Sequence, residues 1–146
     1  MPISFVSEEV RRPNIRFRII SKILKQIVIN NCRVPGNITY IFCSDEYLRN
    51  INVKYLAHDY YTDIITFDYC DERVISGDMF ISVERVKENS ILYMVNINDE
   101  FLRVIIHGLL HLLGFTDSND RERKIMKNAE NEFIDMFKNK NNEYII

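Results

Sequence analysis

Hydrophobic and polar residues recur along this chain with two different periods, and the two periods separate expected strands from expected helices. Short runs rich in β-branched and aromatic residues predict strands. Longer segments with apolar residues three and four positions apart predict amphipathic helices. The expected strands are residues 3–6, 37–43, 64–69 and 78–82, and the expected helices are residues 14–31, 44–56, 83–92, 98–113 and 120–137.

The order of these elements predicts the class of fold. Strands and helices are mixed without strict alternation, which favours an α+β fold with a small mixed β-sheet packed against helices. Asn14 is the expected N-cap of the first long helix, and Pro35-Gly36 is a turn signal. The chain contains no repeat and no Gly/Ser-rich or Pro-rich linker, so we expect residues 1–146 to form a single domain.

The segment 104–115 is apolar except for two histidines, which predicts a buried helix that carries a metal site. His107 and His111 are four residues apart and therefore share one helical face. A single histidine on such a face is usually a core residue with a hydrogen bond. Two buried histidines both need partners for their ring nitrogens, and one shared cation can be the partner of both. Gly114 permits a left-handed turn that would bring Asp117 to the same ion. We therefore expect one divalent ion, zinc, bound by His107, His111 and Asp117.

Composition and charge limit the class of protein. The chain is 47% hydrophobic and 27% charged, and no apolar run approaches the roughly 20 residues of a membrane span. The N-terminal residues lack the basic flank and apolar stretch of a secretory signal, so we expect a cytoplasmic protein with no membrane partner. Cys32, Cys43 and Cys70 are expected to be reduced packing residues. A net charge of −2 argues weakly against indiscriminate nucleic-acid binding, and no DNA partner is expected.

The spacing of the three candidate ligands parallels the zinc-peptidase pattern H-E-x-x-H-x-x-G-x-x-H. Gly108 stands where a peptidase has its glutamate general base, and Asp117 stands where it has the third histidine. No other acid adjoins His107 in sequence, so a peptidase is the weaker interpretation of this spacing.

Three segments together resemble a known family. Residues 52–67, 77–82 and 107–117 follow the order and approximate spacing of the YbeY family, whose metal motif reads H-G-x-L-H-L-x-G-Y-D-H. The resemblance extends over nearly the whole chain. It implies a bacterial, metal-dependent, single-strand-specific endoribonuclease of ribosomal RNA maturation, including the 3′ end of the small-subunit RNA, and of ribosome quality control. It also implies single-stranded or ribosomal RNA and the small ribosomal subunit as partners.

The chain departs from the family pattern at several positions. Asp117 replaces the third histidine, and Leu56 aligns with an arginine that is regarded as important for catalysis. His58, two residues later, is the candidate for a replacement cation or proton donor, although an exposed loop histidine is the ordinary alternative. Thr66 and Asp68 stand in place of the family's serine and proline.

Two further residues share a helical face with the expected ligands. Glu100 and Arg103 precede His107 by seven and four residues, so either could orient a ligand imidazole or contact a substrate phosphate. A surface ion pair between them is the alternative. The main alternative for the whole protein is a non-catalytic ribosome-assembly factor with a structural metal, and Leu56 keeps this alternative open. If Asp117 is not a ligand, Asp120 is the next candidate.

Overall fold

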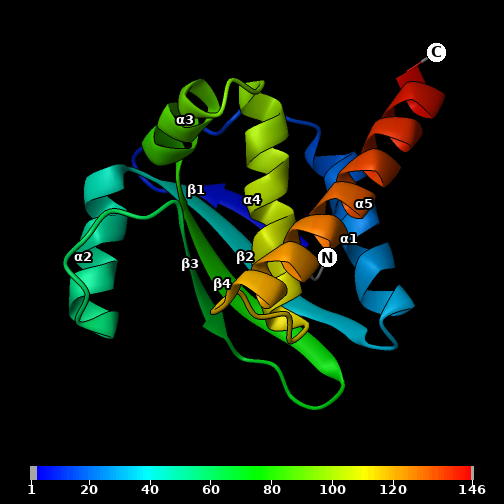
Figure 1. Cartoon of the computed structure of the whole chain (residues 1–146), viewed down its shortest axis with the longest axis horizontal. Coiled ribbons are helices and arrows are strands. Elements are labelled where there is room, and N and C mark those ends of the chain that lie inside the picture. Colours follow the sequence, from blue (N-terminus) through cyan, green and yellow to red (C-terminus); the bar gives the residue numbers. More distant parts are fainter. Residues whose placement is uncertain (1–2, 146) are drawn as a thin grey trace.

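The computed structural model describes residues 3–145, with side chains up to residue 139. Strands and helices are mixed along the chain, as the sequence predicted (Figure 1). Their order is β1 (Ile3–Ser7), α1 (Phe17–Asn30), β2 (Val34–Cys43), α2 (Asp45–Leu56), β3 (Ile64–Asp68), β4 (Val74–Ser82), α3 (Val83–Leu92), α4 (Ile97–Leu112) and α5 (Asp120–Ile145).

The strands form one mixed sheet in the order β1-β2-β4-β3. The pairs β1–β2 and β2–β4 are parallel, whereas β3 pairs antiparallel with β4 and forms an edge. Side chains alternate between the two faces of the sheet, so Met79 and Ile81 of β4 enter the main core while Phe80 between them packs on the opposite face. The predicted α+β fold is confirmed.

The two faces of the sheet carry cores of different size. Helices α1, α4 and α5 pack apolar residues against one face of the sheet and form the main core with it. The Tyr40 hydroxyl of β2 donates to the Ile105 carbonyl of α4 at 2.9 Å. Helix α2 covers the other face, where Leu48 packs with Cys43 and Ile65. Helix α4 contacts β3 and β4 on one side and α3 and α5 on others. The expected buried helix therefore lies against the sheet, near its β3 edge.

Two of the expected local signals are wrong. Helix α1 begins at Phe17 rather than near Asn14, because the Phe17 N–H bonds to the Ile15 carbonyl and the chain turns before the helix starts. Pro35-Gly36 lies inside β2, where the register with β4 shifts between Pro35 and Ile38. A Cβ on Gly36 would lie 2.9 Å from the Ile75 carbonyl oxygen, so the glycine here permits a bulge with close backbone approach.

Other differences concern the ends of elements and one cysteine. Strand β4 begins at Val74, four residues before the expected start, and α5 continues past residue 137 to Ile145.

Cys43 is buried and Cys70 is partly buried against the main core, as expected for packing residues. Cys32 is also a free cysteine, but it is exposed in the turn after α1, so its expected packing role was wrong.

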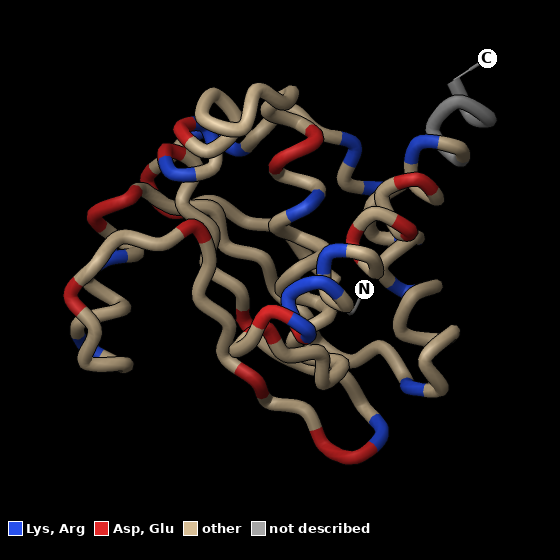
Figure 2. The backbone as a smooth tube through the Cα atoms, viewed as in Figure 1, with Lys and Arg blue, Asp and Glu red and all other residues tan. Residues whose placement is uncertain are grey.

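Helix α5 crosses α4 and carries a concentration of charge at its beginning. Lysine and arginine residues gather along its first turns, as Figure 2 shows. Further along, Met126 and Ile134 are buried in the main core and hold α5 against the rest of the domain. Within the described part of the chain, no helix has the length and hydropathy that a membrane span requires.

Candidate metal centre

The chain reversal after α4 brings the candidate ligands together. Helix α4 ends at Leu112, and Gly114 follows with a φ of 99°, a left-handed conformation that favours glycine. The Phe115 N–H bonds back to the Leu110 carbonyl at 2.9 Å and fixes the turn. The chain then runs back along the helix, so Asp117 lies beside the two histidines. The predicted role of Gly114 in reversing the chain is confirmed.

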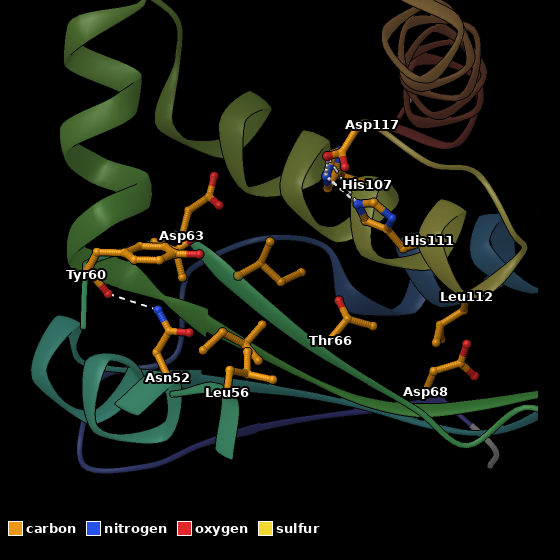
Figure 3. A pocket seen from close by; sticks show the side chains of 13 residues that line it. Asn52, Leu56, Tyr60, Asp63, Thr66, Asp68, His107, His111, Leu112 and Asp117 are labelled. Atoms are coloured by element: carbon orange, nitrogen blue, oxygen red, sulfur yellow. Dashed lines mark hydrogen bonds and ion pairs between the residues drawn. The ribbon is translucent and has the colours of Figure 1, made fainter. Parts of the chain in front are cut away.

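The three ligand atoms converge closely. His107 Nε2 and His111 Nε2 lie 3.0 Å apart, and the Asp117 Oδ2 atom lies 3.4 Å from each of them. All three side chains are partly exposed and face a cavity (Figure 3). The group is therefore arranged so that it could hold one metal ion.

The outward-facing ring nitrogens of both histidines are already occupied. His111 Nδ1 lies 3.0 Å from the Phe115 carbonyl oxygen, which can only accept, so this nitrogen carries a proton and donates. His107 Nδ1 lies 2.6 Å from Oε2 of Glu130 and donates to that carboxylate. In the neutral rings both Nε2 atoms are then unprotonated acceptors that face each other and a carboxylate. Three acceptors at this separation repel unless a cation or an added proton lies among them, and this donor set fits a divalent metal.

A buried carboxylate on α5 orients His107. Glu130 is only 5% exposed, and its second oxygen accepts from Arg103 Nη1 at 2.8 Å. Arg103 also donates to the Asn131 side chain at 2.7 Å. Arg103 thus acts on His107 through Glu130. It does not pair with Glu100, so the alternative of an ion pair between these two residues of α4 was wrong. A carboxylate behind a ligand imidazole fixes its tautomer and makes it a better metal ligand.

This contact leads to a prediction for Glu130→Gln. The amide keeps the shape of the side chain but loses the charge that holds the His107 proton on Nδ1. We expect metal affinity to fall about 10–100-fold, which is the usual effect of losing such a partner. Competition titration with a metal-sensitive dye measures it. Glu132→Gln, which removes an exposed charge two residues along α5, is the matched control. Equal affinities of the two variants would exclude the orienting role of Glu130.

The electrostatic surroundings of the ligand group are acidic. Burial raises the pKa of Asp63, which lines the same cavity, although the charge on His107 opposes the shift. Burial also raises the pKa of Glu100, and the charge of Asp63 adds to it. For His107, burial acts to lower the pKa, but the hydrogen bond to Glu130 and the charges of Glu130, Asp117 and Asp63 outweigh it, so the pKa is raised. These negative charges favour a cation at the site.

The cavity of about 470 Å³ also contains the positions at which the chain departs from the family pattern. Leu56 lies at the C-terminal end of α2 and faces the ligand group across the cavity, with Thr66 of β3 between them (Figure 3). Asp68, at the end of β3, lines the cavity near Leu112. His58 does not belong to the lining. Its ring stacks on Tyr60 at 5.3 Å, and Nδ1 lies 3.2 Å from the Tyr60 hydroxyl. The structure therefore places His58 against the lining residue Tyr60 and does not bring it to the candidate ligands.

Two residues of this region escaped the sequence analysis. Glu130 shares a helical stripe with the buried residues Met126 and Ile134, and a charge within an apolar stripe is the signal that could have identified it. Asp63 precedes the β3 strand and carried no comparable signal. Glu100, which the sequence analysis named as a residue near the candidate ligands, is 5% exposed and lines a second cavity together with His107.

Fold and site together define a small α+β protein with a partly exposed group of two histidines and one aspartate that could hold a metal. Residues 5–138 match the family model described as Endoribonuclease YbeY. The endoribonuclease YbeY of Bacteroides fragilis is 46% identical over 138 residues, which cover 94% of this chain and 99% of that protein. That of Bacteroides thetaiotaomicron is 44% identical over 136 residues, covering 93% and 99%.

The chain therefore belongs to the endoribonuclease YbeY family, and the resemblance found in the sequence is confirmed. The solution structure of TM1509 from Thermotoga maritima has the same fold, with a TM-score of 0.67 and 22% identity over 97% of this chain and 92% of that one.

Proposed function

We propose that this protein is a metal-dependent endoribonuclease that cuts single-stranded RNA and acts in ribosomal RNA processing, including maturation of the small-subunit RNA 3′ end and ribosome quality control. Its partners in this proposal are ribosomal RNA and the small ribosomal subunit. The observation that carries the proposal is the convergence of His107, His111 and Asp117 at the wall of an open cavity. Family membership supports RNA as the substrate.

In this proposal the two histidines and Asp117 hold one zinc ion. Three protein ligands are typical of catalytic rather than structural zinc sites, because a structural site has four. The bound ion would supply Lewis acidity toward a phosphodiester oxygen and would lower the pKa of a water molecule. The carboxylate of Asp117 is a harder ligand than the family's histidine, so manganese is the first alternative metal to test.

The chain's own residues supply orientation. Glu130 and the Phe115 carbonyl hold the two imidazoles with Nε2 toward the cavity. Arg103 holds Glu130 in place. On the opposite wall, Asn52 donates to the Tyr60 carbonyl at 3.0 Å and fixes the loop that carries Tyr60, whose ring is 54% exposed. An unpaired base can stack on such a ring, whereas a base inside a duplex cannot reach it.

A peptidase function is disfavoured by the packing of Gly108. A Cβ on this residue would lie 2.5 Å from Met79 Sδ and 2.8 Å from Ile64 Cδ1. Position 108 therefore faces the sheet and leaves no room for the glutamate base of a zinc peptidase. Glutamate here would place a charge between two apolar side chains, away from the ligand group.

The assembly-factor alternative is favoured by one observation. Leu56 occupies the family arginine's position at the wall of the cavity, and it offers a phosphate neither charge nor hydrogen bond. Of the lining residues of this cavity, none is a lysine or arginine. An RNA bound here would need its cationic contacts from another part of the molecule.

Cleavage of labelled RNA separates the two functions. We expect metal-loaded protein to cut a single-stranded RNA and to leave the same sequence intact in a duplex, because the flexible single strand can adopt the in-line geometry of hydrolysis. A chelator should abolish the reaction. Highly purified protein that binds ribosomal RNA but cuts no RNA with zinc or manganese would establish the assembly-factor alternative instead.

A further inference from the structure

A second cavity, of about 510 Å³, lies on the other side of the ligand group. His107 and Asp117 line both cavities, so the two hollows meet at the candidate metal centre. The second cavity lies among the end of α3, helix α4 and the first turns of α5. Its other lining residues are Tyr93, Val95, Glu100, Arg103, Arg123, Met126, Lys127 and Glu130.

The second cavity contains the cations that the first one lacks. Arg103 is engaged by Glu130 and Asn131, and Arg123 pairs with Asp120 and donates to the Asp117 carbonyl. Lys127 is exposed and has neither an ion pair nor a hydrogen bond within the described part of the chain. Figure 2 shows basic residues along these first turns of α5. Lys127 is therefore available to a phosphate, with Arg123 beside it on the same helix.

An exposed aromatic side chain from another helix end also lines the second cavity. Tyr93 ends α3 and is 59% exposed, and its ring stacks on no other aromatic ring in the described region. It lies within a run of exposed apolar residues that includes Leu92 at 72% and Met94 at 91% exposure. Apolar surface of this kind usually marks a contact site. An exposed ring and an unpaired lysine in one cavity are the kinds of group with which proteins bind single-stranded nucleic acid.

We propose that this cavity is the binding site for one nucleotide that flanks the cleaved bond, with its base on Tyr93 and its phosphate at Lys127 and Arg123. The inference rests on the proposed function, since it names a subsite of that substrate. This site would supply the cationic contacts to RNA phosphates that the first cavity, with Leu56 in place of the family arginine, does not offer. The phosphates of the RNA are then held mainly from one side of the candidate metal centre, because the second cavity has lysine and arginine residues in its lining and the first has none.

Two pairs of matched variants test this subsite. Tyr93→Ala removes the ring, and Tyr69→Ala, with a parent ring 60% exposed and outside both cavities, is its control. Lys127→Glu reverses the free charge, and Lys124→Glu makes the same change on the same helix, outside both cavities. Fluorescence anisotropy measures affinity for a short single-stranded RNA over a range of salt concentrations. The protein is kept metal-free with a chelator, so that the expected cleavage cannot occur, and a gel checks that the RNA stays intact.

We expect Tyr93→Ala to weaken RNA binding about tenfold, and Lys127→Glu to weaken it and to reduce the salt dependence by about one phosphate contact. The two controls should bind like the wild type. If Tyr93→Ala binds as tightly as Tyr69→Ala, or if Lys124→Glu weakens binding as much as Lys127→Glu, the subsite is wrong, and the apolar run near Tyr93 is then better explained by a protein partner. The wild type could also prove unable to cut RNA while Tyr93→Ala and Lys127→Glu still lose affinity and their controls do not. That result would support the RNA-binding site and would contradict only the proposed nuclease activity.

Discussion

Alanine in place of His107 is expected to remove the metal and the activity together. The variant keeps only His111 and Asp117, and two ligands hold a divalent ion weakly. Purified wild-type protein should contain about one zinc-like ion per chain by elemental analysis, and the variant close to none. Cleavage of single-stranded RNA should fall below detection. His111→Ala should behave in the same way, because its Nε2 faces the same point.

A matched histidine separates metal binding from general effects on the protein. His58→Ala removes a ring that stacks on Tyr60 outside the ligand group, so it should leave metal content unchanged. Its effect on cleavage tests the expectation that His58 takes part as a cation or proton donor. Circular dichroism should show that each variant is folded, since His107→Ala leaves the buried Glu130 without one partner. Full metal content in folded His107→Ala would exclude the assigned ligands.

The second large effect concerns Asp117, where the chain departs from the family pattern. Asp117→Ala leaves a site of two histidines, and metal affinity should fall by more than the roughly 10–100-fold that loss of an outer partner causes. Asp117→His should bind about as tightly as the wild type, because imidazole is a good zinc ligand. It removes one negative charge, so the ion and its ligands together would carry one more unit of positive charge.

Calorimetric titration of the three proteins measures this order. The wild type and Asp117→His should have similar affinities, both well above that of Asp117→Ala. An alanine variant that binds as tightly as the wild type would place the third ligand elsewhere. Asp120 is the next candidate by sequence, and its fully exposed side chain pairs with Arg123. Asp120→Ala would then test whether Asp120 is the third ligand.

The ligand group could be predicted from the sequence because its geometry is local. His107 and His111 share a face through the period of the helix, and the reversal at Gly114 needs only a residue that tolerates a positive φ. All three candidate ligands lie within one helix and the turn that follows it. No long-range contact has to be known to place them together, which is why spacing alone was informative.

Other parts of the site depend on packing between distant segments. Glu130 reaches His107 only because α5 folds across α4, and no spacing relation joins residues 23 positions apart on different helices. The second cavity likewise forms where α3, α4 and α5 meet. In the fold, the early part of β4 was missed because Ser76 and Gly77 interrupt its apolar pattern. Gly77 nevertheless pairs with Ile38 and Asp68, and the Ser76 carbonyl accepts from the Tyr69 N–H. Pro35-Gly36 gave a turn signal that sheet pairing overrode.

The most direct test of the central claim is a titration of metal-free protein with zinc while the cleavage of single-stranded RNA is followed. The account predicts no cleavage without metal, a rise that saturates at about one ion per chain, and no recovery of His111→Ala at the same zinc concentrations. Cleavage by the metal-free wild type, or an equal response of wild type and His111→Ala to zinc, would contradict it.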